Sequence, residues 1–232
     1  MTDFALNVVQ AINDWQRGGD HKQKIRRGAE LKAVCGSLPQ TFRTCNVACY
    51  RQEAHEKDRV WQVLADNALP ETIAAWTTDL GVAKEFKGGV PPKGLQGVIF
   101  TLCPPVESIV LNLEAVYADP GFLEACDCYR DQVLGYGDGI GKYGSTQREI
   151  VLEITTLDQA KIFSYGGQSG SREHVAELFF ERHPSSEDVA VFDELCARAG
   201  ISVGDWWLSE PGTRAVLRRM QPHVDRLKAA RL

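Results

Sequence analysis

Apolar residues near the start of the chain recur every three or four positions, which is the spacing of one face of an α-helix. This pattern predicts a helix over residues 3–17, ended by the pair Gly18-Gly19, and a second helix over residues 22–34. Helical spacing returns after residue 171. The predicted helices there span residues 172–183, 186–199, 203–209 and 211–232. The chain is therefore expected to be helical at both ends.

Short apolar runs rich in β-branched and aromatic residues fill the middle of the chain and are typical of buried strands. Strands are predicted over residues 44–51, 73–78, 97–102, 109–113, 147–154 and 161–165, with helices at 56–67, 79–86 and 117–134. We therefore predict an α+β fold. Residues 1–40 form N-terminal helices, residues 41–170 form the core, and residues 171–232 form a helical extension of the same globular unit.

The bulk composition is that of an ordinary globular protein with one large domain. The chain has 232 residues and a net charge of -5, which gives no electrostatic reason to expect a nucleic-acid partner, although it does not exclude one. No apolar run approaches the roughly 18 residues of a membrane helix, and the N-terminus lacks the features of a secretory signal. Seven scattered cysteines fit reduced thiols. These features predict a cytoplasmic protein without a membrane span.

Candidate chemistry lies at the start of the run Gln147-Arg148-Glu149-Ile150. Side chains alternate along a strand, so Gln147 and Glu149 are expected to share one face. The preceding segment, residues 135–144, contains five glycines and is predicted to be a mobile loop that brings this pair to a cleft. The simpler interpretation is an exposed edge strand with a solvated Glu149.

Three short motifs occur in an informative order. Arg51 ends the first predicted strand, Trp76-Thr77-Thr78 leads from a strand into a helix that contains Phe86, and Gln147-Arg148-Glu149 opens a late strand. This arrangement, over residues 44–165, resembles the ADP-ribosyltransferases of the Arg/Ser-Thr/Glu type. The resemblance implies a split core of two β-sheets with helices at the N-terminus, clasping NAD between the sheets.

The resemblance also implies the catalytic roles. Glu149 would stabilise the positive charge that develops on the ribose as the bond to nicotinamide breaks, as a carboxylate does in glycoside hydrolysis. Gln147 would orient an acceptor other than arginine. The product would be an ADP-ribosylated macromolecule, with protein favoured as the acceptor and nucleic acid not excluded.

The same resemblance assigns the NAD-binding residues. Arg51 would bind the diphosphate, since a guanidinium can hold two oxygens at once. Trp76, Thr77, Thr78 and Phe86 would complete the NAD site. Each has a plainer alternative: Arg51 could form a surface ion pair, and the threonines could cap a helix.

The motifs depart from the family pattern, and the main departure is that the hydroxyl triplet is incomplete. Ala75 stands in its first place if the triplet is Ala75-Trp76-Thr77, and Asp79 in its third place if it is Thr77-Thr78-Asp79. A NAD glycohydrolase and a non-catalytic binding protein of the same fold therefore remain alternatives. No metal site is predicted, since Cys126-Asp127-Cys128 lacks two further ligands at suitable spacing.

Overall fold

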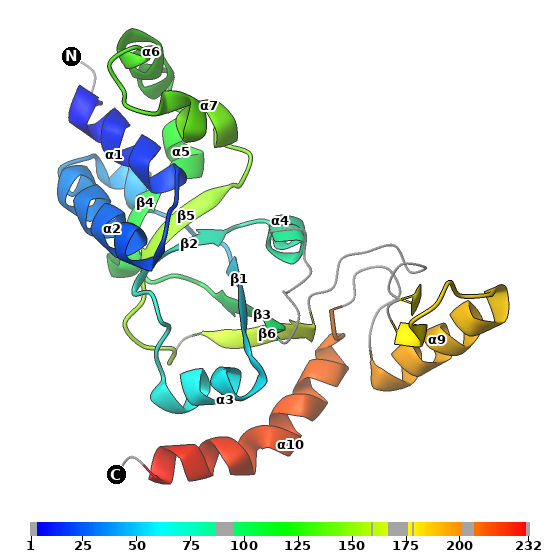
Figure 1. Ribbon diagram of the computed structural model, residues 1–232. Coiled ribbons are helices and arrows are strands. Elements are labelled where there is room, and N and C mark those ends of the chain that lie inside the picture. The colour runs from blue at the N-terminus through cyan, green and yellow to red at the C-terminus, as the bar shows by residue number, and fades with distance from the viewer. Residues whose placement is uncertain are drawn as a thin grey trace. The chain divides into compact units, whose positions relative to one another are not determined.

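The computed structural model describes residues 4–86, 95–158, 160–166, 176–177, 179–200 and 207–230. These residues have mixed α+β structure, as predicted, and form two compact units (Figure 1). Unit 1 comprises Met1–Cys49, Leu69–Asp79 and Cys103–Thr155, and unit 2 comprises Tyr50–Ala68, Leu80–Leu102 and Thr156–Leu232. The predicted core, residues 41–170, thus contributes to both units.

Unit 1 contains three neighbouring antiparallel strands of the sheet, together with helices that precede and follow these strands in the sequence. Strand β5 lies between β4 and β2, and α1 and α2 pack together, with α2 against β2 and β4 (Figure 1). The elements are α1 (Leu6–Gln16), α2 (His21–Cys35), η1 (Gln40–Arg43), β2 (Ile73–Thr77), η3 (Val106–Ser108), β4 (Ile109–Asn112), α5 (Leu113–Tyr117), α6 (Pro120–Tyr129), η4 (Tyr136–Asp138), α7 (Ile140–Tyr143) and β5 (Glu149–Glu153).

The core of unit 1 lies between the helices and one face of this sheet. Ile12 of α1, Leu31 of α2 and Val151 of β5 are completely buried in one cluster. Helix α2 begins where the sequence provides a cap, because the side chain of Asp20 accepts from the Gln23 N–H. The side chains of Glu149, Val151 and Glu153 lie on the same face of β5.

Unit 2 also combines strands with helices. Strand β3 lies between β1 and β6, and α10 packs on α3 and β6. The elements are β1 (Cys49–Glu56), which starts at the last residue of the first segment of unit 1, α3 (Lys57–Asp66), α4 (Leu80–Glu85), β3 (Leu95–Leu102), β6 (Lys161–Gly166), α9 (Ser186–Ala199) and α10 (Glu210–Ala229).

Several predicted boundaries were wrong. The first strand begins at Cys49 instead of residue 44 and continues to Glu56, and the helix predicted over 117–134 is replaced by α5 and α6, the latter ending at Tyr129. The helix predicted over 203–209 falls mostly outside the described residues, and Trp207 within it forms a β-bridge with Gly166. The seven cysteines are free thiols. Within the described part of the chain, no helix has the length and apolar character needed to cross a bilayer.

Candidate functional site

The structure brings together two of the predicted site residues, Thr77 and Glu149. They are directly opposite each other on the neighbouring antiparallel strands β2 and β5. Both side chains are almost fully buried, with 7% of Thr77 and 6% of Glu149 exposed. The Thr77 hydroxyl accepts a hydrogen bond from the Asp79 N–H at 3.1 Å. A carboxylate and a hydroxyl thus lie side by side in unit 1.

Helix α1 supplies a residue of this site that the sequence analysis did not identify. The indole Nε1 of Trp15 donates to Oε1 of Glu149 at 2.5 Å. Space for the ring depends on Gly28 of α2, because a Cβ at that position would lie 3.2 Å from the Trp15 ring and 3.0 Å from Ile73. Close approach of the two helices therefore holds the indole against the carboxylate.

Tyr117 at the end of α5 forms a second polar contact near the carboxylate. Its hydroxyl donates to Oε1 of Gln16 at 2.7 Å, and Gln16 in turn donates to the Gly144 carbonyl at 2.9 Å. Burial raises the pKa of the Tyr117 phenol, and the nearby Cys126 and Glu149 raise it further. The phenol therefore stays protonated, and its hydroxyl remains a hydrogen-bond donor.

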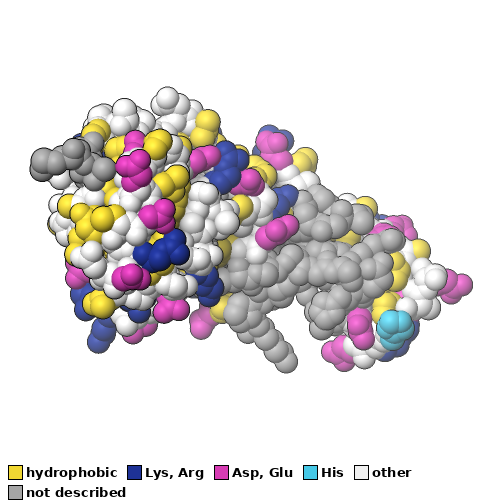
Figure 2. Space-filling view, turned by 90° about the horizontal axis from the view of Figure 1, so that it is seen from above, with side chains coloured by type: hydrophobic (Ala, Val, Ile, Leu, Met, Phe, Trp, Pro, Cys, Tyr) yellow, Lys and Arg dark blue, Asp and Glu magenta, His cyan; other side chains and the backbone are white. Residues whose placement is uncertain are grey.

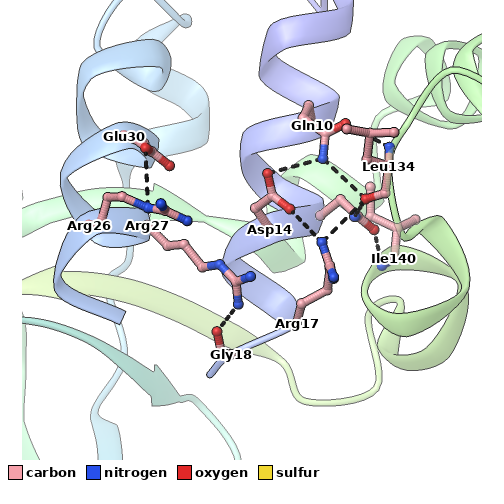
Figure 3. A network of polar contacts seen from close by, with 10 residues as sticks. Gln10, Asp14, Arg17, Gly18, Arg26, Arg27, Glu30, Leu134 and Ile140 are labelled. Carbon is pink, nitrogen blue, oxygen red and sulfur yellow. Dashed lines mark hydrogen bonds and ion pairs between the residues drawn. The ribbon is translucent and has the colours of Figure 1, made fainter. Parts of the chain in front are cut away.

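The glycine-rich segment 135–144 is not the predicted loop but forms η4 and α7, both anchored to α1 (Figure 3). Asn13, completely buried, donates to the Leu134 carbonyl and accepts from the Ile140 N–H, each at 3.0 Å. A Cβ on Gly139 would lie 2.5 Å from Oδ1 of Asn13. The glycine at 139 therefore serves close packing on α1, and the segment forms short helices where a loop was predicted.

Gln147 and Glu149 do not share a strand face, because the strand begins only at Glu149. Arg148 has φ 45°, a left-handed conformation uncommon for a residue with a Cβ, and it interrupts the alternation of side chains. Gln147 lies in the turn before the strand and is half-buried. The two residues remain neighbours in sequence, but their predicted common orientation was wrong.

Arg148 and Thr78 belong to a polar cluster at the surface of unit 1. The Arg148 guanidinium contacts Glu114 at 2.9 Å and Asp79 at 3.6 Å. The backbone carbonyl of Arg148 accepts from the Thr78 N–H at 3.1 Å. The Thr78 hydroxyl donates to Oε2 of Glu114, also at 3.1 Å. These contacts explain how Arg148 is held in its strained conformation, and they direct the Thr78 hydroxyl to Glu114.

Trp76 faces away from Thr77 and Glu149. It pairs with Ile150 across the strands, is 1% exposed, and occupies the opposite face of β2 from its neighbour Thr77. Within the described residues, its indole nitrogen has no hydrogen-bond partner. Trp76 is therefore a core residue of the sheet and does not lie beside the carboxylate.

Arg51 lies in unit 2, on β1, where it forms an ionic triad with Glu53 and His55. Arg51 Nε contacts Oε1 of Glu53 at 2.6 Å, and His55 Nε2 contacts Oε2 at 2.7 Å. Burial alone would raise the pKa of Glu53, but the charge of Arg51 and the hydrogen bonds from His55 and Arg51 lower it to about 2. Phe86, also in unit 2, follows α4 and is 42% exposed.

The chain was compared with protein-family models, curated proteins and solved structures. None of them matches it. An activity of this protein is therefore inferred from the residues of the site and from the resemblance of its motifs.

Metal and nucleic-acid chemistry find little support in the part of the chain that the structure describes. No group of three or more His, Cys, Asp or Glu side chains in it could hold a metal ion. On the face shown in Figure 2, Lys and Arg side chains are interspersed with Asp and Glu instead of forming one basic patch. The buried carboxylate of Glu149 remains the feature that calls for a chemical explanation, since carboxylates are rarely buried.

Proposed function

We propose that this protein is a NAD-dependent mono-ADP-ribosyltransferase whose catalytic residue is Glu149. In the proposed reaction the bond between nicotinamide N1 and ribose C1′ breaks, and its electron pair leaves with nicotinamide. A nucleophile of a macromolecular acceptor forms a new bond to C1′ and loses its proton. The resemblance of Gln147 to the position that orients the acceptor implies an acceptor other than arginine. Protein is the favoured acceptor class, and nucleic acid is not excluded.

The single observation that carries this proposal is the position of Glu149 opposite Thr77. The transition state for breaking the bond has oxocarbenium character, and a fixed carboxylate stabilises its positive charge. Burial strengthens that effect, because an electrostatic interaction is stronger at low local dielectric than in water. A carboxylate with 6% exposure and a hydroxyl across from it supply the chemistry that the resemblance requires.

The remaining roles follow from the resemblance. The resemblance assigns Arg51, whose Nε contacts Glu53, to the diphosphate of NAD, and it assigns Phe86, which is 42% exposed, to an apolar contact with NAD. Thr78 and Trp76 support the strand that carries Thr77 and are no longer proposed to contact NAD directly. The Thr78 hydroxyl is bound to Glu114, and the Trp76 side chain is buried on the other face of β2.

The test uses labelled NAD with a cell extract and two matched variants of one strand. Glu149→Gln removes the charge but keeps the size of the side chain, and we expect it to lower NAD consumption about 100- to 1000-fold, the effect of losing a transition-state charge stabiliser. Glu153→Gln is the control. Its carboxylate lies on the same face of β5, bound to Lys32 at 2.6 Å, and its removal should leave the rate unchanged.

The products separate the candidate functions. Label on macromolecules that is lost in Glu149→Gln supports transfer, and protease or nuclease digestion identifies the acceptor class. Free nicotinamide without labelled macromolecules supports a NAD glycohydrolase. If wild type consumes no NAD, or if Glu149→Gln is as active as wild type, the proposal is wrong, and in the first case a non-catalytic binding protein is the better assignment.

Arg51→Lys tests the assigned diphosphate contact separately. Lysine keeps the positive charge but loses the planar fork that can hold two oxygens. We expect KM for NAD to rise about 10-fold with a smaller change in kcat, the cost of one charge-assisted hydrogen bond. An unchanged KM would remove Arg51 from the site and leave the role of Glu149 intact.

A further inference from the structure

Trp15 of helix α1 donates a hydrogen bond to the candidate catalytic carboxylate of Glu149. It lies 134 positions before Glu149 in the sequence, and its indole N–H meets Oε1 at 2.5 Å. The neighbouring residue Gln16 bonds to Tyr117 and Gly144 on the same side of unit 1. Consecutive residues of α1 thus contact the segments that surround Glu149.

The chemical character of the donor matters for a carboxylate that has to stay negatively charged. An indole N–H is neutral and can only donate, so it fixes one carboxylate oxygen without cancelling the charge. A hydrogen bond to the ionised form also favours that form over the protonated acid. Both effects suit a group that must present negative charge to a developing cation.

We propose that Trp15 is a positioning residue for Glu149. It holds Oε1 so that the carboxylate keeps one orientation toward the ribose of NAD. This inference depends on the proposed function, because it assigns Trp15 a role in the same reaction. Trp15 itself does not touch the reacting atoms.

The alternative is that Trp15 merely fills space, and one substitution separates the two roles. The ring packs against the hydrophobic core of unit 1, and Gly28 leaves room for it. Trp15→Phe keeps an aromatic ring in this place but removes the N–H. If Trp15 only fills space, Trp15→Phe should retain most of its effect. If Trp15 positions Glu149, Trp15→Phe should lose that effect.

The experiment compares Trp15→Phe with Trp61→Phe, a control in which a buried tryptophan of unit 2 loses its N–H instead. For Trp15→Phe we expect kcat to fall about 10- to 100-fold, the effect of losing one hydrogen bond to a charged group. KM for NAD should change less than about threefold, because ground-state binding is retained.

A second measurement does not depend on turnover. The five tryptophans give separate indole ¹⁵N–¹H signals, and Trp15→Phe identifies the Trp15 signal by its loss. In Glu149→Gln this signal should shift more than those of the other tryptophans, because its acceptor has lost its charge. No selective shift would contradict the indole–carboxylate contact and with it the inference.

The outcomes keep the inference apart from the proposed function. NAD consumption by wild type, with kcat unchanged in Trp15→Phe, would overturn the positioning role alone. No NAD consumption by wild type would overturn both, and the selective indole shift would then show that the contact has only a structural role. An equal loss of kcat in Trp61→Phe would also count against positioning.

Discussion

Among the described residues, each of the two units has a glutamate whose side chain is largely shielded from solvent, Glu149 in unit 1 and Glu53 in unit 2, and the environments of the two carboxylates differ in kind. In unit 1, Oε1 of Glu149 accepts from the neutral indole of Trp15. In unit 2, Glu53 lies between Arg51 and His55, with contacts of 2.6 and 2.7 Å. The comparison separates two ways of keeping a carboxylate inside a protein.

The difference concerns what remains of the negative charge. A guanidinium that contacts a buried carboxylate compensates its charge, and the pair contributes to structure. A neutral donor fixes orientation and adds no charge of its own. We therefore expect Glu53 to matter mainly for stability and Glu149 mainly for activity, although both are buried glutamates.

The largest expected effect on stability is at Glu53. Glu53→Gln leaves the charge of Arg51 without its carboxylate, and breaking a buried pair in this way should lower the free energy of unfolding by about 3 kcal/mol. Glu149→Gln keeps a carbonyl oxygen for the Trp15 indole and should lower it by no more than about 1 kcal/mol. Urea denaturation measures both. Equal losses would remove the distinction between the two carboxylates.

The pH dependence of stability sharpens the same comparison. Glu53 has a pKa of about 2 in the folded protein against an ordinary value of 4.5, so the native state binds fewer protons than the unfolded chain between these values. Its contribution is therefore complete above pH 4.5 and disappears as the pH falls toward 2. The shift corresponds to about 3 kcal/mol.

The measurement is the difference in unfolding free energy between wild type and Glu53→Gln, from about pH 6 downward. We expect this difference to narrow steadily below pH 4.5, because acid removes in the wild type the charge that the variant already lacks. A difference that stayed constant down to about pH 3 would mean that Glu53 titrates normally in the folded protein.

Local patterns in the sequence were sufficient for some of these features and insufficient for others. The periodicity of apolar residues predicted α1, α2 and β5 because it depends only on neighbouring positions. The contact between Trp15 and Glu149 joins residues 134 positions apart, which no local pattern contains. It could be anticipated only as far as Trp15 lies on the apolar face of the first helix.

Two local interpretations failed for physical reasons. A glycine can indicate either flexibility or close packing. At Gly139 it is close packing, because Asn13 lies where a Cβ would be, and this contact is not visible in the local sequence. Strand alternation before Glu149 failed because Arg148 adopts a left-handed conformation. Its ion pairs with Glu114 and Asp79 oppose that strain, and they too come from distant parts of the sequence.

Substitution of Asn13 measures how much its neutral hydrogen bonds stabilise unit 1, for comparison with the contacts of Glu53 in unit 2. Asn13→Ala leaves the buried Ile140 N–H without its acceptor and should lower the free energy of unfolding by about 2 kcal/mol. Hydrogen exchange at the Ile140 amide should become faster than in wild type. Gln10→Ala removes more exposed bonds to residue 134 and serves as the control. If Ile140 exchanges rapidly in wild type, segment 135–144 is mobile after all.

The smallest expected effect concerns Arg148, where charge and backbone strain act at one residue. The side chain is 50% exposed, so its ion pairs with Glu114 and Asp79 contribute no more than about 0.5 kcal/mol each. Arg148→Ala and Arg148→Gly both remove these pairs, but only glycine adopts φ 45° without strain. Arg148→Gly should therefore be more stable than Arg148→Ala by about 1 kcal/mol in urea denaturation. The opposite order would mean that the backbone relaxes once the guanidinium is gone, and that the ion pairs, not the fold around β5, impose the left-handed conformation next to Glu149.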